Sequence, residues 1–277
     1  MKTKFITTFT VILFSSIFLF GWGDKGHKLI ATNAMKILPV SMKFPELWKS
    51  EITEHSVDPD NRKRADKSEG PKHFIDIDYY KEYQNGKMIY AKDSLIAIYG
   101  DEVVTREGVL PWATADTYQK LVDAFKSKLK DKIILYSSDL AHYVADGHQP
   151  LHATLNYNGQ FTDQKGIHAR YEIEMIDHHL NELQDEQKNF VPAKINNLLP
   201  FIFDYINESN TYVELLLSAD NFAKKQSKGT FDENYYRLLW FRTKYVTVNQ
   251  FDLAARNLAS LIYSAWVDAG KPALQDK

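Results

Sequence analysis

The stretch that decides the fold reads KIILYSSDLAHYVADGHQPLH and spans residues 132–152. Its apolar residues recur at helical spacing as far as residue 146. Gly147 and Pro150 then interrupt the pattern, and proline cannot continue a helix. The segment therefore predicts a helix over 132–146 that is followed at once by a turn.

The same helical periodicity runs through most of the chain, and long alternating strand patterns are missing. One helix is expected to end before Pro39, and Pro111 is suited to the first turn of another. Two polar stretches, 55–72 and 147–166, are expected to be loops that frame a site. We predict an all-α fold, a single mainly helical domain. The ranges expected to be helical are 30–38, 112–125, 132–146, 169–183, 195–206, 211–223 and 251–267.

The composition excludes several classes of protein. The chain has 277 residues, of which 44% are hydrophobic and 25% charged, and this balance is typical of one globular unit. The chain has a net charge of -2, so it does not have the excess of positive charge expected of a protein that binds duplex nucleic acid. There is no cysteine, which excludes disulfides, thiolate zinc sites and catalytic thiols.

The first 21 residues have the features of an export signal. Lys2 and Lys4 precede an uncharged run over residues 5–20, and Gly21 offers a small residue for cleavage. The run is shorter than the roughly 20 residues that a transmembrane helix needs, which disfavours an uncleaved membrane anchor. We expect a signal peptide at 1–21 and a mature domain at 22–277 that is exported, either to a periplasm or out of the cell.

Histidines and carboxylates at helical spacing predict a metal site. His142 and Asp146 lie at i and i+4 of one predicted helix, and His152 follows its turn. His168 and Glu172 repeat this spacing at the start of a later helix. Either pair alone is better explained by a solvated ion pair or a structural hydrogen bond than by a metal site. Five donors within 31 residues are costly to bury without a cation, and donors of this kind without thiolates suit zinc.

Four motifs follow one another along the chain: Trp22-Gly23-Asp24-Lys25-Gly26-His27, His73-Phe74-Ile75-Asp76, His142-xxx-Asp146-xx-Gln149-Pro150-Leu151-His152 and His168-xxx-Glu172. In order and internal spacing they resemble one superfamily, which unites the secreted zinc-dependent nucleases that cut single-stranded DNA and RNA with the bacterial zinc-dependent phospholipases C. The resemblance covers residues 22–172.

The resemblance implies three zinc ions, with Asp146 shared between two of them. The implied ligands are an aspartate of the 55–72 segment with His73, His142 and Asp146 for one ion; His152, His168 and Glu172 for the second; and the amino nitrogen and carbonyl oxygen of Trp22 with His27 and Asp146 for the third. The free amino group of Trp22 exists only after the signal peptide has been removed, so the resemblance implies that maturation is a condition of activity.

For the loop aspartate, Asp60 is preferred to Asp58. This choice places Lys63 three residues later, where the nucleases carry an arginine that contacts phosphate. Asp60 and Lys63 are thus the expected catalytic residues, and Lys63 is also expected to bind substrate. Zinc lowers the pKa of bound water from 15.7 to about 7, so the implied nucleophile is a zinc-bound hydroxide.

The substrate is less clearly indicated than the metal. Phe74 and Asp76 match the nuclease pattern, in which a ring stacks on a base and a carboxylate accepts hydrogen bonds from its edge, although Phe74 is equally suited to a core. Glu172, preceded by Tyr171, matches the phospholipases instead. We expect an endonuclease for single-stranded DNA or RNA that also accepts 3′-nucleotides, with no stable protein partner. The alternatives are a phospholipase C acting on phospholipid head groups and a non-catalytic metal-binding module, the latter suggested by Ala145 where the family commonly has glycine.

Overall fold

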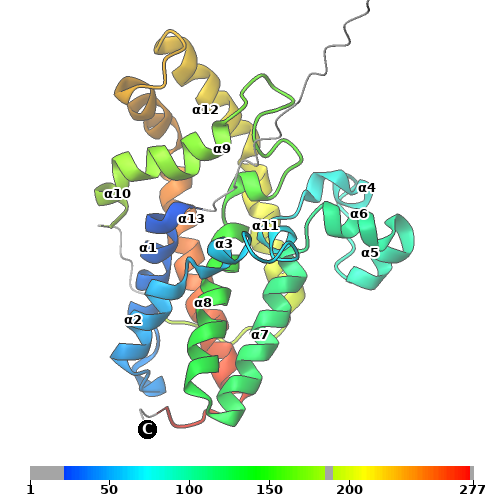
Figure 1. Ribbon diagram of the computed structural model, residues 1–277, viewed down its shortest axis with the longest axis vertical. Helices are drawn as coiled ribbons and strands as arrows, with labels where there is room; N and C mark the ends of the chain where they lie inside the picture. Colours follow the sequence, from blue (N-terminus) through cyan, green and yellow to red (C-terminus); the bar gives the residue numbers. More distant parts are fainter. Residues whose placement is uncertain (1–21, 185–189, 275–277) are drawn as a thin grey trace, which may run out of the picture.

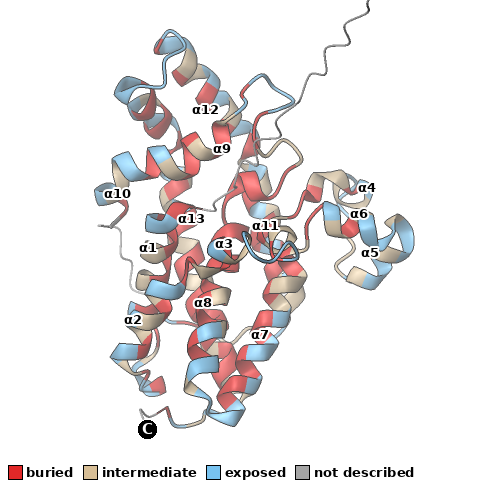
Figure 2. Ribbon diagram, in the orientation of Figure 1, coloured by how far each residue is buried: buried red, intermediate tan, exposed pale blue. Residues whose placement is uncertain are grey.

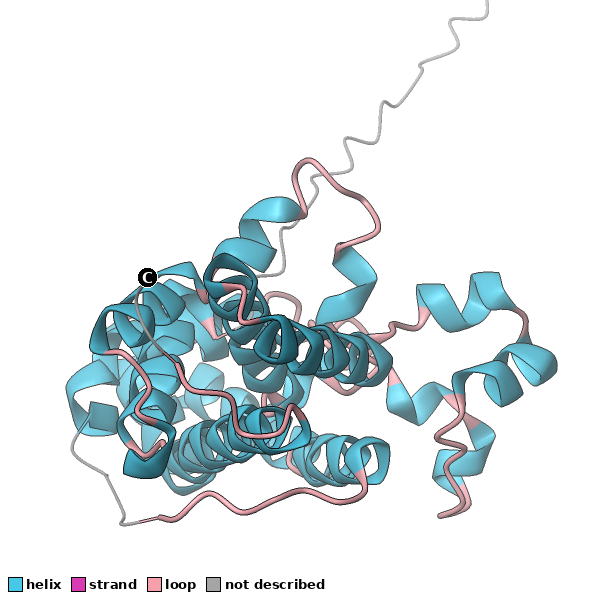
Figure 3. Ribbon diagram, turned by 90° about the horizontal axis from the view of Figure 1, so that it is seen from below, coloured by secondary structure: helices cyan, strands magenta, loops and turns pink. Residues whose placement is uncertain are grey.

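Helices account for every regular element in the part of the chain that the computed structural model describes, residues 22–184 and 190–274 (Figure 3). The α-helices are α1 (Gly23–Lys36), α2 (Glu46–His55), α3 (Asp58–Arg62), α4 (Lys81–Gln84), α5 (Lys92–Tyr99), α6 (Asp101–Arg106), α7 (Leu110–Ser127), α8 (Lys130–Gly147), α9 (Ile167–Ala169), α10 (Ile176–Gln184), α11 (Leu198–Thr211), α12 (Val213–Gln226) and α13 (Glu233–Asp268). Short 3₁₀ helices lie at η1 (Val40–Met42), η2 (Gly70–His73), η3 (Ile77–Tyr79) and η4 (Pro150–His152), and a π-helix at η5 (Arg170–Met175). The prediction of an all-α, single mainly helical domain is confirmed.

The core forms where α1, α7 and α8 pack against the long helix α13, while α2 packs against α1 and α8 (Figure 1). Apolar residues at helical spacing on α8, such as Ile133 and Leu140, meet Phe125 of α7 and Leu258 of α13 in one buried cluster. The last two turns of α8, residues 140–147, are buried on every side (Figure 2). The polar residues of these two turns are therefore held inside the protein.

Helices α4, α5 and α6 form an outlying group at one edge of the bundle (Figures 1 and 3). Leu95 of α5 and Val104 of α6 are buried against Ile75 and Tyr80, and so anchor this group to the segment that follows η2. The chain then returns to the bundle through Gly108, whose φ of +92° and close approach to the Phe74 carbonyl exclude a side chain. This turn holds the end of α6 beside the site.

The predicted helices are present, but several of their bounds were wrong. The helix expected at 195–206 begins at Leu198, because the Ile195 amide donates to Ser264 Oγ at 2.9 Å instead of joining a helix. The helix expected at 251–267 begins already at residue 233: its first half is rich in aromatic and polar residues that are buried at helical spacing. The segment 55–72, predicted as a loop, contains α3.

The signal peptide and a possible membrane-spanning helix are considered separately from the fold. The predicted signal peptide at 1–21 lies outside the described residues. Within the described residues, none of the helices combines the length and the apolar character needed to cross a bilayer. This includes α13, which is 36 residues long but mixes charged and apolar side chains.

Candidate metal centre

Eight side chains predicted to bind metal come together at the inner end of α8, and each is at most 3% exposed. They are supplied by seven separate elements, because the helical bundle brings α1, α3 and η2 against α8, and the turn after α8 leads directly to η4. The eight are His27 of α1, Asp60 of α3, His73 of η2, His142 and Asp146 of α8, His152 of η4, His168 of α9 and Glu172 of η5.

Five of the eight form two overlapping donor groups around Asp146. His73 Nδ1 lies 2.9 Å from both Asp146 Oδ2 and His142 Nε2. Asp60 Oδ1 is 3.5 Å from each of these two ring nitrogens, and His27 Nε2 is 3.5 Å from Asp146 Oδ1. Ligand atoms of His27, Asp60 and His142 lie within 4.8 Å of one another, as do those of His73, His142 and Asp146.

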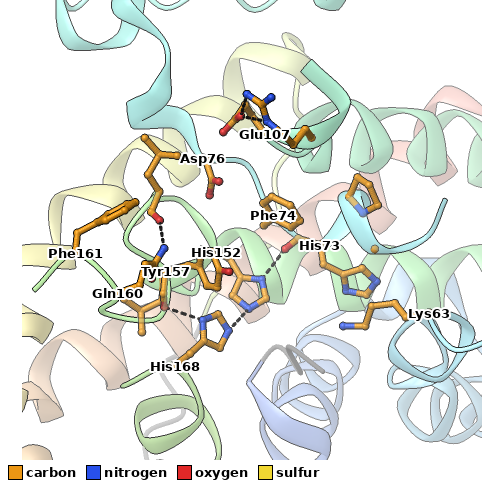
Figure 4. A pocket seen from close by; sticks show the side chains of 15 residues that line it. Lys63, His73, Phe74, Asp76, Glu107, His152, Tyr157, Gln160, Phe161 and His168 are labelled. Carbon is orange, nitrogen blue, oxygen red and sulfur yellow. Dashed lines mark hydrogen bonds and ion pairs between the residues drawn. The ribbon is translucent and has the colours of Figure 1, made fainter. Parts of the chain in front are cut away.

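The other three side chains form a third donor group, with His152 and His168 facing each other (Figure 4). His168 Nε2 is 3.1 Å from His152 Nε2 and 3.0 Å from Glu172 Oε2. His152 Nδ1 lies 3.7 Å from Asp146 Oδ1, so the third group borders the other two. This set of residues is the one that the resemblance assigned to a single zinc.

The hydrogen bonds of His152 and His168 test whether a cation fits between them. The Nδ1–H groups donate to the carbonyl oxygens of His73 and Tyr157, at 2.6 and 2.9 Å. A carbonyl only accepts, so each Nδ1 carries a proton, and the Nε2 atoms of the two rings face each other at 3.1 Å. A cation that accepts both Nε2 lone pairs would satisfy this contact. Carbonyl oxygens that orient ligating histidines in this way are typical of zinc sites.

Several atoms of the cluster are buried without a partner. Both ring nitrogens of His27, Oδ2 of Asp60 and Oδ1 of Asp146 make no hydrogen bond among the described residues. Each such atom costs roughly 1 to 3 kcal/mol when it is left unsatisfied. Their lone pairs converge, so a cation is the partner that satisfies them together.

The pKa values within the cluster show the same demand for positive charge. Burial acts to lower the pKa of His142, but the carboxylates of Asp146 and Asp60 outweigh burial and raise it to about 10. His27 goes the other way: burial, together with the charge on His142, lowers its pKa to about 3. The carboxylates thus favour positive charge at His142, which a bound cation would supply in place of a proton; the His27 ring stacks on His142 with the ring centroids 4.0 Å apart.

Comparison with protein families agrees with this chemistry. Residues 26–240 match the model of the zinc dependent phospholipase C family. The chain belongs to this family. No curated protein matches it at a significant level. Family membership and the donor groups together support zinc as the metal and zinc-dependent hydrolysis of phosphate esters as the kind of activity.

In this member of the zinc dependent phospholipase C family, the two candidate loop aspartates lie in different environments. Asp58 is 43% exposed and pairs with His55 at 2.8 Å on the surface. Asp60 points inward to the donor groups, and Lys63 Nζ lies 2.5 Å from its Oδ1. The five residues of α3 turn one aspartate outward and the other inward. Lys63 thus contacts a residue of the donor groups, and its role in binding phosphate stays a prediction.

Trp22 lies at the start of α1 beside the cluster. Its indole Nε1–H donates to the Ala145 carbonyl at 2.9 Å, next to Asp146 in the chain. Its ring packs against Tyr171 and Phe251, with centroids 5.6 and 4.6 Å away. These contacts of the side chain hold residue 22 in place beside the donor cluster, while the role of the Trp22 amino group stays a prediction.

Two buried residues that support the donors were missed from the sequence. Gln149 donates Nε2–H to Glu172 Oε2 at 2.7 Å and is itself held by the Leu151 amide. Glu69 accepts hydrogen bonds from Tyr143 and Lys72, and its Oε1 lies 3.7 Å from His73 Nε2. Gln149 stood inside a recognised motif, whereas Glu69 lay in a charged stretch that gave no sign of its burial.

A cavity of about 600 Å³ opens beside the donors (Figure 4). His73, His152 and His168 line the cavity and also belong to the donor groups. The predicted substrate residues Lys63, Phe74 and Asp76 line it as well. A ligand in the cavity therefore has direct access to the donor cluster.

The far end of the cavity is acidic. The main chains of Asp76 and Glu107 are joined by a hydrogen bond of 2.7 Å, and Arg106 pairs with the Glu107 carboxylate at 2.5 Å. Burial, followed by the charges of Glu107 and Asp78, raises the pKa of Asp76 to about 8. Asp76 lines the cavity, and its Oδ1 is buried and makes no hydrogen bond among the described residues.

Proposed function

We propose that this protein is an exported zinc-dependent phosphodiesterase that cuts single-stranded DNA or RNA internally and also accepts 3′-nucleotides. One observation carries the proposal: the three histidines that line the cavity are also metal donors. A phosphate ester in the cavity would thus contact both the metal and the chain. Export is supported by the signal-like sequence at 1–21.

We infer three zinc ions with the ligands that the resemblance implies, Asp146 being shared between two of them. When bound, the ions would supply an activated water near neutral pH and stabilise the oxygen that leaves. The chain's own contribution is to hold the donors rigidly: His152 and His168 are each fixed by a carbonyl, and Glu172 by Gln149. The nine inferred ligands are Trp22, His27, Asp60, His73, His142, Asp146, His152, His168 and Glu172.

Three further residues are proposed to act on the substrate. Lys63 lies at the cavity beside Asp60, where a phosphoryl oxygen would meet its ammonium group. Phe74 is half-buried on the wall, and a nucleobase stacked on it would gain roughly 1 to 3 kcal/mol. Asp76 would bind the edge of that base through its unpartnered oxygen. This combination favours a nucleotide.

A phospholipase C is the second candidate. It is favoured by the family match and by apolar side chains around the cavity, namely Leu151, Leu155 and Phe161. Phe161 is 70% exposed and would be available to a lipid. The head group of a phospholipid would then occupy the acidic end that we assign to a base.

A substrate panel tests the proposal. Mature protein loaded with zinc would be incubated with single-stranded DNA, RNA, a 3′-nucleotide and phosphatidylcholine vesicles, each with and without a chelator. We expect chelator-sensitive cleavage of the nucleic acids and little release of head group. Cleavage of the lipid alone would support the phospholipase, and zinc binding without cleavage of any ester would support the non-catalytic module.

A further inference from the structure

A second buried cluster of charged side chains lies behind the third donor group, on the side away from the cavity. Its centre is an ion pair between Arg170, the first residue of η5, and Asp220 of α12, with Nη2 2.9 Å from Oδ1. Asp220 is fully buried, and Arg170 is 6% exposed. Neither side chain reaches the cavity or the metal donors, so the proposed function gives them no part.

The Arg170 guanidinium clamps the chain that leads into His168. It donates to the carbonyl oxygens of Gln164 and Lys165 at 3.1 and 3.0 Å. Gly166 follows these two residues with a φ of +95°, and a Cβ at this position would lie only 2.8 Å from Arg170 Nη1. The turn before His168 is therefore shaped around the guanidinium.

Asp220 ties this turn to the C-terminal helices. It accepts Gln164 Nε2–H at 2.7 Å, and the Tyr235 hydroxyl of α13 also donates to it. Gln164 donates to the Leu217 carbonyl of α12 as well, at 2.7 Å. The carboxylate thus joins α12, α13 and the turn before α9 at one point.

The segment held in this way carries two of the three donors of the third group. His168 lies two residues before Arg170 and Glu172 two residues after it, at the junction of α9 with the π-helix η5. A π-helix is rare and occurs mostly as a single turn inside an α-helix, so its register needs support from tertiary contacts. The ion pair contacts the chain at this junction.

We propose that Arg170 and Asp220 are positioning residues that fix His168 and Glu172 against His152, and so set the zinc affinity of the third donor group. The proposal rests on the zinc centre inferred above. It concerns one of the three ions, because the other two donor groups are built from α1, α3, η2 and α8. Loss of the pair should therefore weaken one ion and spare the others.

The test is Asp220→Asn, which keeps the shape of the side chain and removes its charge. Zinc content and stepwise affinity would be measured by competition with a chelator of known strength, with circular dichroism as a check on folding. We expect a 10–100-fold fall in affinity for one ion, as for other residues that orient metal ligands, with recovery of full occupancy in excess zinc. Tyr235→Phe keeps the ion pair but removes the hydroxyl that donates to the carboxylate and accepts from Arg170 Nε at 3.0 Å, and should weaken the same ion less.

Two comparisons identify the ion and exclude a general loss of stability. Asp220→Asn in a Glu172→Gln background should cause no further fall for the ions that remain, because that ligand loss already disrupts the third group. Asp252→Asn breaks an ion pair of 2.8 Å with Arg256 elsewhere on α13 and should leave all zinc affinities unchanged.

Asp220→Asn with wild-type affinity for every ion, or with equal weakening of all three, would overturn the positioning role. If Asp220→Asn fails to fold, unchanged zinc affinities in Tyr235→Phe would overturn it equally. A wild-type protein that binds no zinc would instead overturn the proposed function, so the two failures are distinguishable.

Discussion

The donor cluster and the cavity wall beside it are built in different ways. The donors lie on helices or at their ends, are almost fully buried and are fixed by further buried groups such as Gln149 and Glu69. The wall is formed by short turns and by the end of the outlying helix α6, and it includes the exposed ring of Phe161. One region is a rigid part of the core, and the other is a surface laid over it.

This difference teaches which property of the protein each region governs. The donors determine the class of reaction, because metal chemistry needs fixed ligands at fixed spacing. The wall determines which ester is bound, and loops tolerate changes of sequence without loss of the fold. Family membership therefore establishes the zinc-dependent chemistry while leaving nucleic acid and phospholipid both open as substrates.

Asp146→Ala should have the largest effect, since this carboxylate lies at the centre of the donor cluster, with ring nitrogens of four histidines within 4 Å of it. We expect activity to fall by about 10³-fold or more, because preorganised groups at a reacting centre are each worth 10²–10³ and two ions would be affected. Thermal stability should fall too, since metal binding is coupled to folding. Steady-state kinetics and metal analysis would measure both.

Asp139→Ala is the matched control for this change. Asp139 lies two turns earlier on α8 and pairs with Arg62 at 2.9 Å, outside the three donor groups. The variant should keep its zinc content and most of its activity. Full activity in Asp146→Ala would show that the central role assigned to this carboxylate is wrong.

An extra residue before Trp22 should have the next largest effect. The extended chain presents an amide nitrogen where the mature chain would present an amine, so one zinc would lose a chelating group. We expect one ion fewer per protein and a fall in activity of about 10²-fold. Metal analysis of mature and extended proteins provides the check, and equal zinc contents would contradict the chelation.

The donor cluster was largely predictable from the sequence, because the i, i+4 spacing of His142 with Asp146 places both on one face of a helix. The helix itself was marked by its apolar period and by Gly147. By contrast, α4, α5 and α6 are short, and the first half of α13 hides its buried face among aromatic and polar residues. Local periodicity is weak in such segments, and packing decides their structure.

The cavity wall was harder to predict for a different reason. Phe74 and Asp76 were found by a motif, but Glu107 is brought to them by main-chain hydrogen bonds such as the one between residues 76 and 107, across 31 positions of the chain. Arg170 and Asp220 are likewise 50 residues apart. A single sequence carries no local signal for contacts of this kind.

Phe74→Ala sharpens the contrast between the two regions. Loss of the ring should reduce kcat/KM for single-stranded nucleic acid by roughly 10–100-fold, the worth of one stacking contact. Zinc content should not change, because Phe74 is outside the donor groups. If kcat/KM fell by a similar factor for phosphatidylcholine and did not change for nucleic acid, the substrate would be a phospholipid and not a nucleic acid. Phe161→Ala, on the exposed side of the same cavity, is the companion variant for a lipid contact.

Asp76→Asn should change the pH dependence of the free energy of unfolding and leave the metal site unchanged. Burial and the neighbouring acids raise the pKa of Asp76 from 3.8 to about 8, so the folded protein holds a proton that the unfolded chain releases above pH 4. The free energy of unfolding should then fall as pH rises from 4 to 8, by about 1.4 kcal/mol per pH unit for this one group. The amide variant lacks this penalty and should gain stability over the wild type across the same range. Urea unfolding of the zinc-free proteins at pH 5 and pH 7 would measure the difference, and identical pH profiles would show that Asp76 titrates normally and that the cavity's acidic end is well solvated.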